Sequence, residues 1–400
     1  MSDSQRTSRG ATSDPGPVYR NPNLLIIFAV TLVGVMGTAS ITPTFPRVAD
    51  VLGVSGRRIG LLVTAYYVPG LVLTPLLGLL ADHWGRKPVL VPSLFLFGIA
   101  GSACALARDF EMLLLLRALQ GVGGASLAAM SLTIIGDLFS GDRRTAAMGY
   151  NASVLSVGTA TYPTVGGALA LLGWYYPFAL PILAVPVGLF VLARLERSDP
   201  DNSLELRAYL GRLWSLLADR GVAAVFVLTL LTFAALFGPY LAYFPMLMSE
   251  RFGSSSFVIG LFISSVSVAS GGTSARLGRL TRRFSSRTLL LVAYACYAVS
   301  FAAIGYAENF WLILVPSLGY GVAQGLNIPT LQSLLAGVAP DEQRAAFMSL
   351  NGLFYRIGQT VGPTVAGVLY TSVGFCGMYL ATAGMMVVGL VTVAAAIDGE

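Results

Sequence analysis

The sequence has few charged residues, and this scarcity excludes most soluble proteins. Only 11% of its 400 residues are charged and 55% are hydrophobic, whereas about a quarter of the positions in a soluble domain are charged. The composition therefore predicts a protein that crosses a membrane several times. Nineteen acids against 25 bases also exclude a disordered or acidic interaction protein.

Cysteine and histidine are scarce as well, which argues against a disulfide framework or a metal centre. The three cysteines, Cys104, Cys296 and Cys376, lie in apolar runs without the spacing of metal ligands. The single histidine is His83. No H-E-x-x-H, G-x-S-x-G or phosphate-binding loop pattern occurs. We therefore expect no enzyme activity, no cofactor and no bound metal.

Apolar runs of about 20 residues, the length that crosses a bilayer as a helix, recur along the whole chain. We expect an all-α membrane protein with twelve transmembrane helices, because these runs are too long for the strands of a membrane barrel. The predicted spans are residues 24–45, 58–80, 88–107, 111–136, 145–171, 174–193, 221–248, 256–277, 287–306, 310–336, 344–371 and 374–396.

The positions of the basic residues predict the orientation, since Lys and Arg are retained in cytoplasmic connections. Of the 25 bases, 18 fall on the side of the N-terminal tail and five across the membrane, at Arg47, Arg57, Arg58, Arg108 and Arg251. Both termini are therefore expected in the cytoplasm. Because the basic balance has this topological explanation, nucleic acid is not an expected partner.

An internal repeat predicts two parallel halves of six helices. A shift of 200 residues aligns nine identical residues in the 24 positions from 144 to 167, including Asn151 with Asn351 and Pro163 with Pro363. The predicted domains are a disordered cytoplasmic tail (1–20), a first bundle (21–193), a cytoplasmic linker (194–220) and a second bundle (221–396). An even number of spans in each half makes the repeats parallel, with an axis along the membrane normal.

Two patterns place charge beside or inside the spans. The turn after the second span reads Gly78-Leu-Leu-Ala-Asp82-His-Trp-Gly85-Arg86-Lys87, in which glycines permit a tight turn and Asp82 can pair with an arginine. The fourth span contains Arg117 and Gln120. A charge inside a membrane is costly enough that it normally faces a cavity or a partner.

A third pattern in the fifth span combines small residues with a proline. Small residues at these intervals let helices approach closely, and the proline bends its helix. The pattern consists of Gly149, Gly158, Pro163, Gly166 and Gly167.

These patterns resemble motifs A, B and C of the major facilitator superfamily, with the departures His83 in motif A and Tyr162 in motif C. The resemblance implies the fold of two six-helix halves with substrate near the membrane midplane. It also implies that the motif A turn, with Asp82 at its centre, latches the halves on the cytoplasmic side. Arg117, with Gln120, would take part in proton transfer. Motif C is found in drug:proton antiporters and favours export.

Polar and aromatic residues inside the spans are candidates to line the substrate cavity. As a set they suit small amphipathic molecules better than inorganic ions. No Asp or Glu lies deep in a span, so the sequence shows no obvious proton carrier. Arg356 has no equivalent in the repeat, and with Arg117 it indicates neutral or anionic substrates. The candidates are Asn151, Tyr162, Tyr240, Tyr243, Gln324, Asn327, Asn351, Tyr355, Arg356 and Gln359.

The resemblance predicts a monomeric secondary transporter in the inner membrane of a prokaryote. We expect it to export small amphipathic molecules by alternating access, with protons as the coupling partner and the lipid bilayer as its solvent. An alternative is a carrier of an organic anion, a siderophore or a sugar. A more remote alternative is a membrane receptor that binds without transport.

Overall fold

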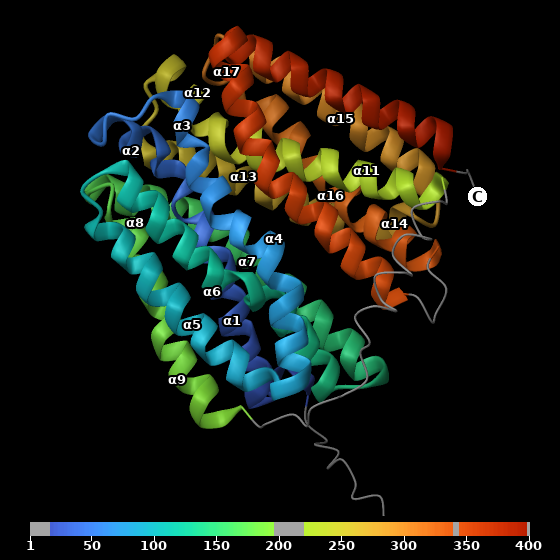
Figure 1. Ribbon diagram of the computed structural model, residues 1–400. Coiled ribbons are helices and arrows are strands. Elements are labelled where there is room, and N and C mark those ends of the chain that lie inside the picture. Colours follow the sequence, from blue (N-terminus) through green and yellow to red (C-terminus); the bar gives the residue numbers. More distant parts are fainter. Residues whose placement is uncertain (1–16, 196–219, 339–343, 398–400) are drawn as a thin grey trace, which may run out of the picture.

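The computed structural model describes residues 17–195, 220–338 and 344–397, and within these ranges the secondary structure is entirely helical. Figure 1 shows two groups of helices side by side, the first from blue to green and the second from yellow to red. The first group consists of η1 (Val18–Arg20), α1 (Pro22–Ala39), η2 (Thr42–Thr44), α2 (Phe45–Val51), α3 (Gly56–Ile59), α4 (Leu61–Trp84), α5 (Arg86–Ala103), η3 (Cys104–Leu106), α6 (Phe110–Leu138), α7 (Gly141–Leu172), α8 (Tyr176–Ala179), η4 (Leu180–Leu183) and α9 (Ala184–Arg194).

The second group repeats this arrangement after the linker. It includes a π-helical segment, η5, in which Pro239 interrupts the regular backbone ladder. The second group consists of α11 (Arg220–Ala235), η5 (Leu236–Tyr243), α12 (Phe244–Phe252), α13 (Ser256–Ser274), α14 (Leu277–Leu280), α15 (Ser286–Tyr306), α16 (Leu314–Val338) and α17 (Arg344–Ala396).

The described helices are consistent with the predicted membrane crossings. Ten are long and apolar enough to span a bilayer. The last of these, Leu350–Ala396, contains a break at Gly374, whose φ of 66° is non-helical, so it comprises two helices. The 25-residue helix α16 lies before it. The fold of two multi-helix halves is as predicted, with the first span longer than expected because it continues through α2 to Val51.

Part of the predicted domain organisation lies outside the described residues. This applies to residues 1–16 of the predicted tail and to residues 196–219 of the predicted linker. The end of the predicted tail, Val18–Arg20, forms a 3₁₀ turn, and the Tyr19 ring contacts the Tyr150 ring at a centroid distance of 5.9 Å. The described helical structure therefore begins before residue 21.

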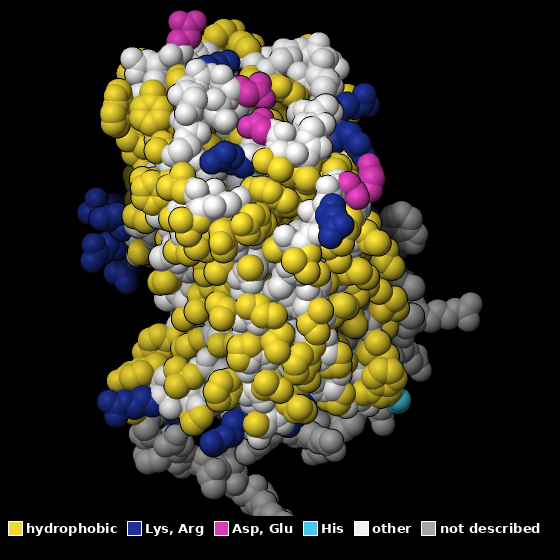
Figure 2. Space-filling model, turned by 90° about the vertical axis from the view of Figure 1, so that its left-hand side faces the viewer, with side chains coloured by type: hydrophobic (Ala, Val, Ile, Leu, Met, Phe, Trp, Pro, Cys, Tyr) yellow, Lys and Arg dark blue, Asp and Glu magenta, His cyan; other side chains and the backbone are white. Residues whose placement is uncertain are grey.

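Apolar side chains form a broad belt on the molecular surface. Figure 2 shows this belt on one face, with many of the charged side chains toward its upper and lower parts. Exposed apolar residues of the described helices include Ile99, Leu106, Leu115 and Phe190. Exposed apolar side chains in such numbers would make a soluble protein aggregate, but in a bilayer they contact lipid tails of the same polarity.

The two halves contact each other along two equivalent helix pairs. In the pair α7 and α13, a Cβ added at Gly260 would overlap the Pro163 carbonyl, and Thr164 is hydrogen-bonded to Ser264 at 2.7 Å. In the pair α4 and α17, a Cβ at Gly60 would lie 2.8 Å from the Pro363 carbonyl oxygen. We call these two helix contacts the seam.

The equivalence of the two pairs follows from the sequence repeat. Thr64 is hydrogen-bonded to Thr364 at 3.2 Å and donates to the Thr360 carbonyl at 3.0 Å. The shift of 200 residues relates the Thr64–Thr364 contact to the Thr164–Ser264 contact. Thr64 is the equivalent of Ser264, and Thr164 is the equivalent of Thr364. The shift found in the sequence thus relates the two contacts as well as the two folds.

The halves separate beyond the seam. At the seam, buried apolar residues of both halves form one core, which includes Phe45, Ile59 and Phe237. A second core, containing Leu24 and Leu90, consists only of residues of the first half. On α4 the side chains beyond the seam, such as Val72 and Leu76, are exposed. The molecule is therefore closed at the seam end and open toward the end that contains the motif A turn.

Candidate functional site

A cluster of aromatic residues lies between the halves, next to the seam. Tyr66 and Tyr67 of α4 are in edge contact at 4.8 Å, and Tyr67 contacts Phe237 of the second half at 5.0 Å between ring centroids. The Tyr67 hydroxyl is hydrogen-bonded to Thr38 of α1 at 3.1 Å. In the second half, Phe233 contacts Tyr355 at 3.9 Å. We call these residues, together with Arg117 and Arg356, the central site.

Arg117 supplies a buried positive charge on the first-half side of the central site. Its side chain is fully buried, and its guanidinium lies 4.4 Å from the Tyr66 ring centroid. It donates to the Gly37 carbonyl at 2.7 Å, the Leu62 carbonyl at 3.2 Å and Gln120 Oε1 at 2.6 Å. Arg117 therefore joins α1, α4 and α6, and Gln120, the other candidate for proton coupling, is one of its hydrogen-bond partners.

Arg356 reaches across from the second half at the point where the halves separate. Its Nη2 donates to the Ala125 carbonyl of α6 at 3.0 Å. A Cβ added at Gly70 of α4 would overlap Arg356 Nη1, so the glycine leaves room for this side chain. The same Ala125 carbonyl also accepts a hydrogen bond from Thr74 at 2.9 Å.

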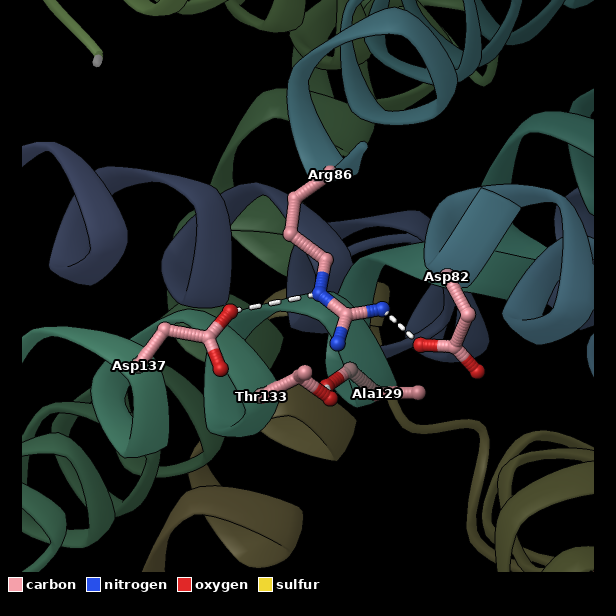
Figure 3. A network of polar contacts seen from close by, with 5 residues as sticks. All are labelled: Asp82, Arg86, Ala129, Thr133 and Asp137. Atoms are coloured by element: carbon pink, nitrogen blue, oxygen red, sulfur yellow. Dashed lines mark hydrogen bonds and ion pairs between the residues drawn. The ribbon is translucent and has the colours of Figure 1, made fainter. Parts of the chain in front are cut away.

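The motif A turn forms a network of charges at the open end of the molecule. Arg86 donates to Asp82, and its Nε donates to Asp137 at 3.2 Å (Figure 3). Gly85 has a φ of 90°, which glycine adopts at little steric cost. Lys87 donates to the Leu195 carbonyl at 2.9 Å, at the end of α9. In this conformation the described partners of motif A belong to the first half.

The motif C residues take part in two kinds of contact. Gly166 faces the Ser40 carbonyl within the first half, and Gly167 faces the Ser256 carbonyl across the seam. A Cβ at either position would overlap the opposing backbone. A Cβ added at Gly158 would lie 3.1 Å from the Leu32 side chain. Gly149 differs, because a Cβ there would meet nothing within 4 Å.

Several predicted cavity residues instead hold helices together within one half. Asn151 accepts a hydrogen bond from Thr31 at 2.8 Å, and its repeat equivalent Asn351 accepts one from Thr229 at 2.9 Å. Asn327 is fully buried and donates to Thr232 at 2.7 Å.

The other predicted cavity residues divide between the seam, the second-half core and the central site. Tyr243 donates to the Gly56 and Arg57 carbonyls at the seam end. Tyr240 is buried and stacks on Tyr320 at 4.4 Å. Tyr162 lies beside Gly158, and Gln324 is half-buried on α16. Tyr355 and Arg356 belong to the central site, and the buried Gln359 lies one turn further along α17.

The sequence analysis did not single out Tyr66, Tyr67, Phe233 and Phe237. Aromatic residues are common in membrane helices, and only the tertiary structure places these four between the halves. One sequence signal could have pointed to Tyr66 and Tyr67. They lie between Gly60, which recurs in the repeat as Gly260, and Gly70, and glycines mark places where helices can approach closely.

The fold and the central site define a membrane transporter built from two helical halves around a site between them. Residues 27–304 and 225–398 match the sequence profile of the Major Facilitator Superfamily. The chain belongs to this family, and the predicted resemblance is confirmed.

Similar proteins extend over nearly the whole chain. The Bacillibactin exporter of Bacillus subtilis (strain 168) is 25% identical over 396 residues, which cover 94% of this chain and 97% of the relative. Multidrug resistance protein 1 of the same organism is 24% identical over 356 residues, which cover 88% and 90%. The structure of a D-xylose-proton symporter has a TM-score of 0.80 at 17% identity and covers 94% of this chain and 98% of that one, which shows the shared fold.

Proposed function

We propose that this transporter exports small amphipathic molecules by alternating access, coupled to the entry of protons. The observation that carries the proposal is the placement of the central site beside a closed seam. Each half contributes aromatic residues and one arginine to this site. Two relatives, the Bacillibactin exporter and Multidrug resistance protein 1, support export over uptake. The motif C residues at the seam support the same direction.

The transport cycle follows from the unequal contacts at the two ends. The present conformation is closed at the seam and open at the motif A end. Rocking of the two halves about the central site would open the seam and close the other end. The seam is held by few polar contacts and by backbone surfaces that meet at glycines, so it can separate without stranding charged groups.

The positive-inside distribution supports a cytoplasmic location for the motif A end and for both termini. The open end then faces the cytoplasm, where an exporter collects its substrate. We propose a monomer in the inner membrane of a prokaryote, with bundles at residues 21–193 and 221–396 and a linker at residues 194–220. The residues of motif A, Gly78, Asp82, Gly85, Arg86 and Lys87, would join the halves when the cytoplasmic end closes.

Proton coupling is the part of the proposal that depends most on the family resemblance. Arg117 and Gln120 are its candidates, because Arg117 is buried within the central site and joins three helices, α1, α4 and α6. A change in proton occupancy near Arg117 would alter how these helices pack against the aromatic cluster.

The test is transport by the purified protein in proteoliposomes loaded with a fluorescent amphipathic dye. We expect dye movement to accelerate when a proton gradient is imposed and to stop when an ionophore dissipates it. Movement that ignores the gradient would support the alternative of a facilitated carrier for an organic anion, siderophore or sugar. Dye binding without any movement would support the receptor alternative.

A further inference from the structure

The charges at the central site are unbalanced. Arg117 and Arg356 both lie near Tyr66. The Arg117 guanidinium lies over the Tyr66 ring, and Arg356 donates to the Ala125 carbonyl, next to Gly124, which faces the Tyr66 hydroxyl. In the described parts of the chain, Arg58 pairs with Glu111, and Arg86 pairs with Asp82 and Asp137. All of these lie near helix ends, so no acid pairs with either central arginine.

Carbonyl groups satisfy hydrogen-bond donors without neutralising a charge. Both arginines bond to backbone carbonyls, and Arg117 Nη2 and Gln120 Nε2 are buried donors with no hydrogen-bond partner among the described residues. Burying a charge costs free energy, which a counter-ion recovers most effectively where the dielectric constant is low. A ligand that carries a negative charge would supply this missing counter-ion.

The two arginines are not equally available to a ligand. Arg117 is fully buried and makes three hydrogen bonds, two of which join α6 to α1 and α4. Arg356 is half-buried at the point where the halves separate and makes one. If Arg356 turned away, the Ala125 carbonyl would keep its bond from Thr74. Arg356 can therefore exchange its carbonyl partner for a ligand without leaving a buried carbonyl unpaired.

We propose that the central site selects small aromatic organic anions and that Arg356 binds their anionic group. The guanidinium fork matches the two oxygens of a carboxylate, and the half-buried rings of Tyr67, Phe233 and Tyr355 offer surfaces for an aromatic body. Arg117 lies over the ring of Tyr66, which contacts Tyr67, and contributes positive potential. This inference rests on the proposed export function and names its substrate class.

The experiment compares two dyes that share one ring system and differ in charge. Wild-type protein in proteoliposomes is tested with fluorescein, which is anionic, and with rhodamine 6G, which is cationic. We expect fluorescein to be moved faster than rhodamine 6G. Arg356→Gln should lower fluorescein flux about tenfold or more and leave rhodamine flux unchanged or higher, whereas Arg356→Lys should retain part of the preference for the anion.

Arg287→Gln is the matched control. Arg287 also donates to a backbone carbonyl, that of Ala394, and this contact does not involve the central site. Its dye preference should equal that of wild type. If rhodamine 6G moves and wild type shows no preference for fluorescein, or if Arg356→Gln keeps that preference, the inference is overturned while export stands. If folded wild type moves neither dye, the export function itself is overturned. The wild-type comparison decides even if a variant fails to fold.

Discussion

Arg117 shows how a single residue can stabilise a membrane protein through its charge and its geometry. It is fully buried, and its hydrogen bonds to the Gly37 and Leu62 carbonyls join two other helices to α6. No other side chain type offers several donors in a planar fork with a face that stacks on Tyr66. The residue that the family resemblance links to proton transfer is thus also a structural support.

We predict that Arg117→Gln destabilises the protein as well as impairing coupling. Loss of the charged donors should lower the free energy of unfolding by about 1–3 kcal/mol, because buried carbonyls lose their partners. Thermal unfolding in detergent would measure this change. The control is Arg287→Gln, which removes an arginine near a helix end and should lower stability less. Unchanged thermal stability would show that Arg117 is not a structural support.

Coupling is measured separately on the fraction of Arg117→Gln that folds. We expect dye flux that no longer responds to a proton gradient. A normal gradient response in this variant would place proton coupling at other residues.

Among helices, the seam depends on close approach at glycines. The α7–α13 contact brings Gly260 against the Pro163 carbonyl, and the α4–α17 contact brings Gly60 against that of Pro363. At each contact the backbones meet where a larger residue would keep the helices apart.

We predict that Gly260→Val opens the seam. The added side chain overlaps the backbone of α7, so the conformation closed at this end should become less populated. A cysteine placed at Ser264 would then react faster with a water-soluble thiol reagent added from the seam side. Gly271→Val is the control, because it lies in the same helix and a Cβ there meets nothing within 4 Å. Equal labelling in the two variants would contradict the assignment of the seam as a gate.

The motif A turn makes a second prediction at the scale of elements. Asp82 and Arg86 are partly exposed, with side-chain exposures of 26% and 17%, so Asp82→Asn should cost no more than about 1 kcal/mol of stability. We nevertheless expect a large loss of transport, because Asp82 is proposed to join the halves when the open end closes. Glu111→Gln, which removes an exposed ion pair at the other end, is the control. Normal flux in Asp82→Asn would remove the latch role.

The helices and their order were predictable from the sequence, whereas the central site was only partly so. Apolar runs and charged turns determine where helices can cross a bilayer, and the 200-residue repeat gave the two halves. Asn151 and Asn351 were expected in a cavity, but a polar residue in a span bonds equally well to a neighbouring helix, as both do here. Which side of a helix meets the other half depends on tertiary packing, so Tyr67 and Phe237 could not be distinguished from other aromatic residues.

For the whole molecule, the open end predicts a measurable change in distance during transport. Gly78 and Gly278 are equivalent in the repeat, lie at this end in each half, and have no neighbours within 4 Å of an added Cβ. Cysteines introduced at both positions, with Cys104, Cys296 and Cys376 replaced, would accept spin labels without strain. We expect a population with a shorter distance between the labels under conditions that favour the seam-open state, such as the Gly260→Val variant. A single unchanged distance would contradict rocking of the two halves.

The reciprocity of the seam also bears on how such a chain could have originated. The first half presents Gly60 to Pro363 and Pro163 to Gly260, so each half carries both the glycine surface and the proline surface. A contact of this kind is isologous, the type that joins identical subunits about a two-fold axis. Because the repeats are parallel, two copies of a six-helix ancestor would insert in the same direction and meet through this contact. Such a homodimer would already have had a gate, and joining the two genes would have freed Arg117 and Arg356 to diverge, each in one half only.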